Sequence, residues 1–205
     1  MFKIFNMEIK NKLPLIAALL FLLAPGRGSA QEPDAGAHVS FYGVEVNGTP
    51  EEFAQGMRDK GFPDGSRYAG TWVLKGTYSD WKDVEAFILQ KDGAVYGVSL
   101  FLKCKKSWEK TKEQYFALKG HLRAEYGIPE CVEEFRDKYV EGGGRESLAF
   151  LKNRAQYVSR FFVDGGVVEL KVAYIDYAPM HYELVVTWLD EQNTKEAGFV
   201  LPERL

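Results

Sequence analysis

Apolar residues along the chain follow two different periods, and each period appears twice. Around Phe53 and Met57 they lie four positions apart, which is the spacing of one helix face. A longer helical pattern runs from Ser107 to Gly127; its apolar positions are Trp108, Tyr115, Leu118, Leu122 and Tyr126. After each helical pattern, apolar residues alternate with polar or small ones, as in a β-strand. The pattern therefore predicts a unit of one helix followed by several strands, which occurs twice along the chain.

Both predicted helices end at similar sequences. The first closes with GFP at residues 61–63 and the second with GIP at residues 127–129. A glycine can adopt the left-handed conformation that ends a helix, and a proline two residues later cannot continue it. The start of the first helix is also marked, because Thr49 can cap it, Pro50 suits its first position and Glu52 can complete a capping box.

The alternating segments predict antiparallel strands joined by short turns. They lie at residues 72–78, 83–90 and 96–102 in the first half, and at residues 155–163, 168–174 and 182–188 in the second. Asp92-Gly93 is a strong signal for a two-residue hairpin, and Asp164-Gly165 marks a similar turn.

These elements predict an α+β fold made of two tandem units, each a helix packed on an antiparallel three- to four-stranded meander. The first unit would span residues 31–104 and the second residues 105–192, with residues 193–205 as a short polar tail. The equivalent caps Gly61 and Gly127 are 66 residues apart, a spacing that favours an internal duplication.

Residues 1–30 have the composition of a secretory signal peptide. Three lysines form a basic start, residues 13–24 are a short apolar run, and small residues precede Gln31. The apolar run is too short for a membrane-spanning helix. We therefore expect an exported protein, periplasmic or extracellular, whose mature chain has no stable membrane insertion.

The mature chain would be mildly acidic. Residues 1–30 hold four basic residues and one acidic residue, so residues 31–205 keep 22 Lys and Arg against 28 Asp and Glu, a formal charge of −6. This charge disfavours nucleic acid and anionic membrane surfaces as partners. The roughly 175 residues suffice for one good core.

The predicted plan resembles a known architecture. Two stretches carry the likeness: FYGVEVNGTPEEF at residues 41–53 opens the first unit, and GVVELKV with YELVVTWLDEQN, within residues 166–193, closes the second. A helix and a meander in tandem after a signal peptide resemble the beta-lactamase-inhibitor-protein-like architecture, and also a set of exported proteins of Bacteroidetes type. The resemblance implies a binding or envelope role and supplies no catalytic residue.

The chain has two cysteines, Cys104 and Cys131. In an oxidising compartment, an isolated pair predicts a disulfide rather than a metal site. Closing this loop of about 28 residues would stabilise the fold by roughly 3–4 kcal/mol. A reactive thiol is the alternative, because Lys103, Lys105 and Lys106 surround Cys104 and would lower its pKa.

The sequence contains no familiar catalytic motif, such as a nucleophile elbow, a zinc-protease helix, a phosphate loop or a dinucleotide fingerprint. Its three histidines, His38, His121 and His181, have no other His or Cys at ligand spacing. The sequence therefore predicts no metal site, no catalytic residue and no cofactor. The lysines between residues 103 and 112 could attract an anionic partner, although a solvated helix start explains them more simply.

Two aromatic stretches are candidates for recognition. GTYSDWKD at residues 76–83 places Tyr78 and Trp81 around a predicted turn, and YIDYAPMHY at residues 174–182 places Tyr177 near another. Aromatic side chains on turns provide a large contact area for little loss of entropy. Burial in the core is the alternative for all three residues.

These features support three functional hypotheses. The first is an exported, non-enzymatic binding module that recognises a protein or a glycan through its aromatic loops. The second is a small envelope hydrolase or a thiol enzyme that uses Cys104 or Cys131 with a histidine such as His121. The third is a structural component of an envelope assembly. We favour the first hypothesis, because no convergent catalytic set accompanies the duplicated plan.

Overall fold

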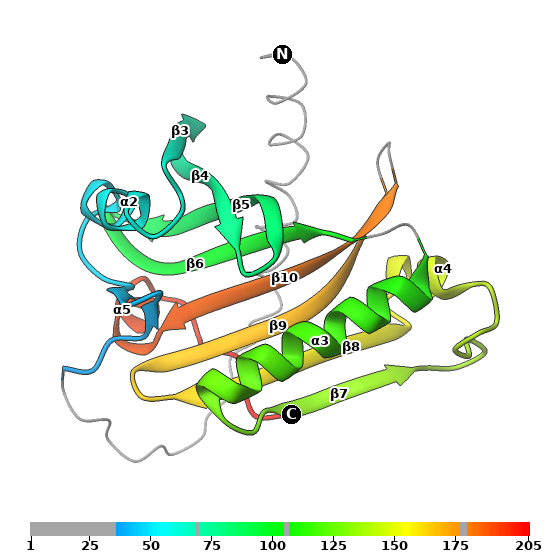
Figure 1. The fold of residues 1–205 in the computed structure, drawn as a ribbon. Coiled ribbons are helices and arrows are strands. Elements are labelled where there is room, and N and C mark those ends of the chain that lie inside the picture. The colour runs from blue at the N-terminus through cyan, green and yellow to red at the C-terminus, as the bar shows by residue number, and fades with distance from the viewer. Residues whose placement is uncertain (1–35, 69, 105–106, 177–179) are drawn as a thin grey trace.

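Strands from both halves of the chain join one antiparallel sheet in the computed structural model, which describes residues 36–68, 70–104, 107–176 and 180–205 (Figure 1). The order across the eight-stranded sheet is β3-β4-β5-β6-β10-β9-β8-β7. The strands are β3 (Asp64–Tyr68), β4 (Thr71–Tyr78), β5 (Trp81–Lys91), β6 (Ala94–Lys103), β7 (Glu130–Phe135), β8 (Ala155–Val163), β9 (Gly166–Ile175) and β10 (His181–Asp190). A two-stranded sheet, β1 (Ser40–Phe41) with β2 (Val44–Glu45), precedes them.

The two halves meet where β6 pairs with β10. At this joint the hydroxyl groups of Ser99 and Thr187 share a buried hydrogen bond of 2.8 Å. The backbones also approach closely, because a Cβ atom added to Gly97 would lie 2.8 Å from the carbonyl oxygen of Trp188. Only a glycine fits this position without a shift of the strands.

The predicted fold class is wrong. The structure is mostly β (45% strand), with one eight-stranded antiparallel sheet and four helices in its described part, instead of two helix-plus-meander units. The physical reason is the joint between β6 and β10, which pair along most of their length although their paired residues are 80 or more positions apart in sequence. Alternation shows which face of a strand is buried, but it does not show which strand lies next to it.

The helices are α2 (Pro50–Arg58), α3 (Trp108–Tyr126), α4 (Glu146–Leu151) and α5 (Glu191–Glu196). Helix α2 packs on β4, β5 and β6, whereas the longer α3 lies over β8, β9 and β10 (Figure 1). The main hydrophobic core fills the space between these two helices and one face of the sheet.

Several local predictions are confirmed. Thr49 caps α2 and forms the predicted capping box with Glu52. Gly127 ends α3 as predicted, with a positive φ of 86°, whereas α2 already ends at Asp59, so Gly61 (φ 98°) lies beyond the cap. The hairpin at Asp92-Gly93 joins β5 to β6, and both of its residues have positive φ angles.

A second, smaller hydrophobic cluster contains the alternate residues of the same strands, such as Phe87, Phe101 and Val185. Since alternate residues point to opposite faces, this cluster lies on the face away from α2 and α3. Phe199 and Leu201 pack against it. The segment 193–205, expected to be a polar tail, thus holds most of α5 and contributes apolar side chains to a core.

The predicted signal peptide lies outside the described residues. Within the described ranges, none of the helices combines the length and the apolar character needed to cross a membrane.

Candidate functional site

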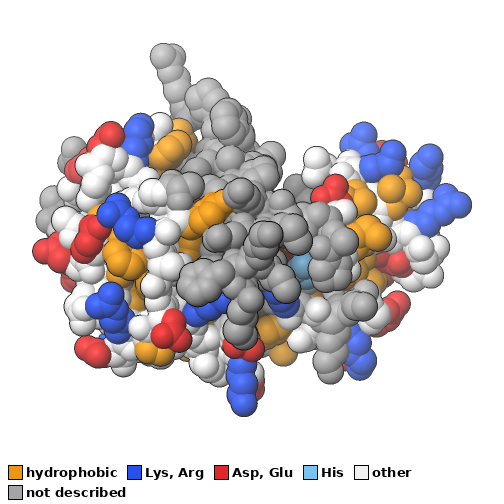
Figure 2. Space-filling model, turned by 90° about the horizontal axis from the view of Figure 1, so that it is seen from above, with side chains coloured by type: hydrophobic (Ala, Val, Ile, Leu, Met, Phe, Trp, Pro, Cys, Tyr) orange, Lys and Arg blue, Asp and Glu red, His pale blue; other side chains and the backbone are white. Residues whose placement is uncertain are grey.

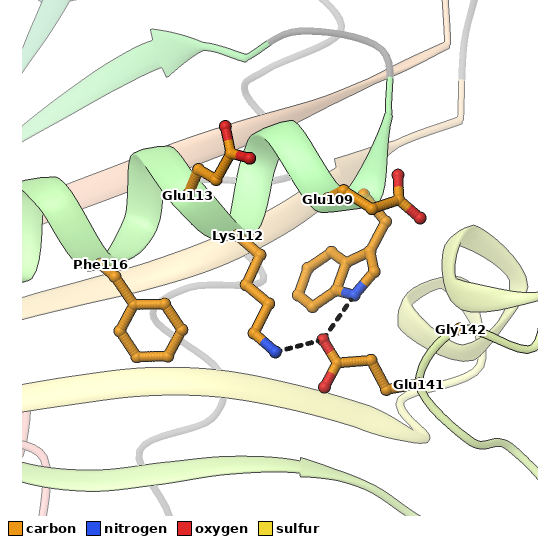
Figure 3. A pocket seen from close by; sticks show the side chains of 7 residues that line it. Glu109, Lys112, Glu113, Phe116, Glu141 and Gly142 are labelled. Atoms are coloured by element: carbon orange, nitrogen blue, oxygen red, sulfur yellow. Dashed lines mark hydrogen bonds and ion pairs between the residues drawn. The ribbon is translucent and has the colours of Figure 1, made fainter.

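A pocket of about 350 Å³ opens between the first half of α3 and the loop that connects β7 to α4 (Figure 3). We call it the Phe116 pocket. Its lining residues are Trp108, Glu109, Lys112, Glu113, Phe116, Glu141 and Gly142.

The sequence of α3 places one row of side chains along this pocket. Ser107 caps the helix, since its hydroxyl oxygen accepts a hydrogen bond of 3.3 Å from the backbone N–H of Lys110. Residues four apart on a helix share a face, so Trp108, Lys112 and Phe116 form one row. Figure 3 shows Lys112 and Phe116 extending from the same side of α3, with Lys112 directed toward Glu141.

Glu141 fixes the loop against the rest of the pocket. Its Oε1 accepts a hydrogen bond of 2.9 Å from the indole of Trp108 and lies 2.6 Å from Nζ of Lys112. Its Oε2 accepts a hydrogen bond of 3.3 Å from the hydroxyl of Tyr157 on β8. Partial burial raises the pKa of Glu141, but the hydrogen bonds from Lys112, Trp108 and Tyr157 outweigh it, and the pKa is lowered overall.

Phe116 is 40% exposed and lies between two cations. The ring centroid is 5.9 Å from Nζ of Lys112 and 5.6 Å from Nζ of Lys119. Each lysine has its own carboxylate at 2.6 Å: Lys112 pairs with Glu141, and Lys119 with Glu133 on β7. The result is an accessible aromatic ring with an ion pair on either side.

More exposed apolar side chains belong to the same end of the molecule. Val140, in the loop that carries Glu141, is 65% exposed, and Leu148 and Leu151 of α4 are 39% and 42% exposed. In Figure 2, hydrophobic side chains lie beside Lys and Arg side chains at the end where Figure 1 places α4. Exposed apolar surface with a charged rim is typical of interaction sites.

The structure places Tyr78 in the core instead of on a surface. Only 2% of its area is exposed, and its ring contacts those of Phe41, Tyr42 and Trp188. Burial raises the pKa of Tyr78, and its buried hydroxyl has no hydrogen-bond partner among the described residues. Tyr78 therefore offers no contact area to a ligand.

The other predicted recognition residues give less surface than expected. Trp81 pairs with Tyr78 across the turn from β4 to β5, but it is partly buried and packs against the main core. Tyr177 lies outside the described residues. Tyr78 and Trp81 thus lie around one turn, as predicted, but they pack mainly into the core instead of forming an exposed recognition surface.

The predicted disulfide is not formed, because Cys104 and Cys131 are both free. Burial raises the pKa of Cys104 to about 12, and the nearby carboxylate of Glu183 adds to this effect. The expected lowering of this pKa is therefore wrong, because loss of hydration raises it; Lys105 and Lys106 lie outside the described residues. His121 lies on the exposed side of α3, and its ring is 6.4 Å from the ring of Tyr78.

The sequence analysis missed the Phe116 pocket. Helical spacing alone could have identified the row from Trp108 through Lys112 to Phe116. Glu141 had no such signal, because it lies in a glycine-rich loop that only the folded chain brings to α3. In the described part of the chain, no group of three or more His, Cys, Asp and Glu side chains could hold a metal ion.

No protein-family model, curated protein or solved structure matches this chain.

Proposed function

We propose that this chain is an exported, non-enzymatic binding protein that holds a partner protein at the Phe116 pocket. The observation that carries the proposal is the exposed ring of Phe116 between the ion pairs Lys112–Glu141 and Lys119–Glu133. An aromatic anchor surrounded by charged groups is the usual composition of a binding hot spot.

The rigidity of the pocket supports this proposal. Trp108 is buried, and its hydrogen bond to Glu141 holds the loop against α3. A partner that binds here does not need to order the loop first, which reduces the entropic cost of association.

A protein fits this surface better than a small ligand or a glycan. The pocket volume of about 350 Å³ is near the lower limit for small-molecule sites. Val140, in the loop that carries Glu141, and Leu148 and Leu151 of α4 expose further apolar surface. A partner surface can cover both areas, whereas a sugar would occupy only the pocket.

The chemistry of these residues argues against a thiol enzyme that uses Cys104 and against a hydrolase that uses Glu141. At neutral pH a thiol with a pKa of about 12 is protonated, so Cys104 is a poor nucleophile. A general acid in a hydrolase needs a raised pKa, whereas the pKa of Glu141 is lowered and its oxygens already accept three hydrogen bonds.

The test compares two truncations to alanine in the full chain, tagged at its C-terminus and exported by its source cells. Phe116→Ala removes the anchor. Ile128→Ala is the control, because Ile128 is 82% exposed and lies past the end of α3, whose last residue, Tyr126, is about 15 Å from Phe116 along the helix axis. Bound proteins are identified by mass spectrometry from both variants and from wild type, and the fold of each is checked by circular dichroism.

A partner that binds wild type and Ile128→Ala, but binds Phe116→Ala at least about 30-fold more weakly, would support the proposal. Equal capture by all three proteins would rule out the Phe116 pocket as the site. Loss of glycan binding on an array, instead of protein binding, would replace the protein partner with a glycan. A stoichiometric complex that survives the Phe116→Ala change would favour a structural role.

A further inference from the structure

Strand β7 forms one edge of the large sheet and is paired on one side only. It pairs with β8 from Glu130 to Phe135 without a register shift, and among the described residues no strand lies on its other side (Figure 1). A free strand edge presents backbone N–H and C=O groups that another chain can bind. Proteins commonly protect such edges with lysine, proline or a bulge, and β7 contains none of these.

The pairing with β8 shows which backbone groups of β7 point outward. The N–H of Arg136 donates a hydrogen bond of 2.7 Å to the carbonyl oxygen of Arg154, its opposite residue when the β7–β8 register is continued. In an antiparallel pair, residues that bond to the partner strand alternate with residues whose N–H and C=O groups point away from it. The even-numbered residues of β7 therefore bond to β8. The outward backbone groups belong to Cys131, Glu133 and Phe135.

These three residues alternate with the others, so their side chains lie on one face of the sheet, the face that α3 covers. Glu133 pairs with Lys119 of α3 at 2.6 Å, and the ring centroid of Phe135 lies 5.5 Å from that of Trp108. Residues directly opposite each other on neighbouring strands share a face. On a strand added to β7, the residue opposite Glu133 would therefore have its side chain on the side of α3.

Phe116 lies over the same row of the sheet. Its ring centroid is 6.5 Å from that of Tyr157, the residue of β8 that pairs with Glu133. Lys119 links the two sites, because it pairs with Glu133 and its Nζ lies 5.6 Å from the centroid of the Phe116 ring. Neighbouring strands are about 5 Å apart, so a large apolar side chain opposite Glu133 can reach the exposed part of this ring.

We propose that the partner protein adds a strand to the free edge of β7 and places an apolar side chain of this strand against Phe116. The inference rests on the proposed function, because it describes how the partner reaches the Phe116 pocket. Backbone hydrogen bonds to Cys131, Glu133 and Phe135 hold the added strand, and the contact with Phe116 selects its sequence.

The charge of β7 indicates a basic partner strand. β7 contains Glu130, Glu133 and Glu134 and no Lys or Arg. Glu130 and Glu134 point to the face away from α3, where lysine or arginine side chains of an added strand would form cross-strand pairs of opposite charge. Their present partners, Arg204 and Arg136, are exposed, so these ion pairs can be exchanged at little cost. The preferred strand therefore alternates apolar residues, on the side of α3, with basic residues on the other side.

A second copy of this chain fits the edge less well. Outward backbone groups must face each other, so the two antiparallel registers with the longest overlap of two β7 strands are centred on Val132 and on Glu133. The first places Glu130 opposite Glu134, and the second places Glu133 opposite its own copy. Like charges directly opposite each other are destabilising, so β7 disfavours pairing with itself.

The first experiment uses synthetic peptides with blocked ends as probes of the edge. KFKFKFK has the preferred alternation, KKFFFKK has the same composition without it, and EFEFEFE has the opposite charge. Amide hydrogen exchange of the purified full chain is measured by NMR with and without each peptide. We expect KFKFKFK to slow exchange at Cys131, Glu133 and Phe135 at least about fivefold, and the other two peptides to slow it less.

The amides of Val132 and Glu134 are the internal control for this experiment. They bond to β8 and should therefore exchange slowly in the free protein, with little change when a peptide is added. Unchanged exchange at the three outward amides in the presence of KFKFKFK would overturn strand addition. Equal slowing by all three peptides would overturn the predicted sequence of the partner strand.

The second experiment repeats the partner capture with a matched pair of variants at Cys131. Cys131→Pro removes an outward N–H and places a ring where an added strand would lie, whereas Cys131→Ala keeps the N–H. Proline is tolerated on the free side of an edge strand, so both variants should fold, which circular dichroism checks. We expect the partner to bind Cys131→Pro at least about tenfold more weakly, and Cys131→Ala as tightly as wild type.

The capture results separate this inference from the proposed function. A partner lost by both Phe116→Ala and Cys131→Pro supports the pocket and the added strand. A partner lost by Phe116→Ala but retained by Cys131→Pro supports the pocket and overturns strand addition. A partner retained by Phe116→Ala rules out the pocket, and with it the proposed contact of the added strand. If Cys131→Pro does not fold, the exchange experiment on wild type decides whether β7 accepts a strand.

Discussion

Nδ1 of His38 lies 2.9 Å from Oδ2 of Asp190, whose side chain is fully buried 152 residues farther along the chain. The same carboxylate accepts a hydrogen bond from the backbone N–H of Val39 and caps α5 through the N–H of Asn193. Asn47 lies 2.9 Å from the other ring nitrogen of His38. One buried acid thus holds the first described segment and the last helix to the end of β10.

Replacement of Asp190 by alanine is therefore expected to be strongly destabilising. It removes a helix cap and leaves His38 and the N–H of Val39 without their acceptor, which together should cost at least about 2 kcal/mol. Urea unfolding of both proteins measures the difference. The control is Asp137→Ala, because Asp137 is 62% exposed in its pair with Arg154 and should contribute less than about 1 kcal/mol. Equal effects of the two changes would contradict the assigned role of Asp190.

Tyr78→Phe should leave stability unchanged or increase it slightly. The hydroxyl of Tyr78 is buried and has no hydrogen-bond partner in the described part of the chain. Its removal therefore ends a desolvation cost without breaking a hydrogen bond that the structure shows. Tyr78→Ala should instead cost about 3–5 kcal/mol, because it empties a space among the rings of Phe41 and Trp188. Thermal and urea unfolding distinguish the two variants. A loss of more than about 1 kcal/mol in Tyr78→Phe would mean that the hydroxyl does have a partner.

Acid should weaken the attachment of the loop that carries Glu141. The pKa of this carboxyl is lowered in the folded state from its ordinary value of 4.5. A lowered pKa contributes stability above the unfolded-state value, and this contribution is lost as the pH falls from about 4.5 through the folded-state value. Unfolding measured between pH 7 and pH 3 should therefore show a smaller dependence on pH in Glu141→Gln than in wild type. Identical profiles would show that Glu141 does not contribute.

Cys104 should resist alkylation until the protein unfolds. With a pKa raised to about 12, almost none of this thiol is ionised at pH 8, whereas exposed Cys131 remains accessible. Iodoacetamide at pH 8 should label Cys131 first, and Cys104 should follow only after urea is added. Peptide mapping by mass spectrometry reads the two sites separately. Rapid labelling of Cys104 in the folded protein would contradict its burial.

The sequence by itself determined the local structure. The capping box of Thr49 and Glu52, the helix end at Gly127 and the hairpin at Asp92-Gly93 form as predicted. Each depends on residues that are only a few positions apart, so a short stretch of sequence contains all the residues whose interactions stabilise it. Alternation likewise predicted the apolar face of β9, where Val168, Leu170 and Val172 join the main core. In β6 it failed at Tyr96, which lies in the smaller cluster, whereas Val98 joins the main core.

The tertiary structure decided everything that depends on residues far apart in the chain. The pairing of β6 with β10 makes one sheet from two expected units, because strand partners are selected by packing between distant segments. The same packing buries Tyr78 and raises the pKa of Cys104. Both effects arise because residues distant in sequence replace the water around these side chains. It also brings Glu141, from a distant loop, to Trp108 and Lys112 of α3, and this contact creates the candidate site.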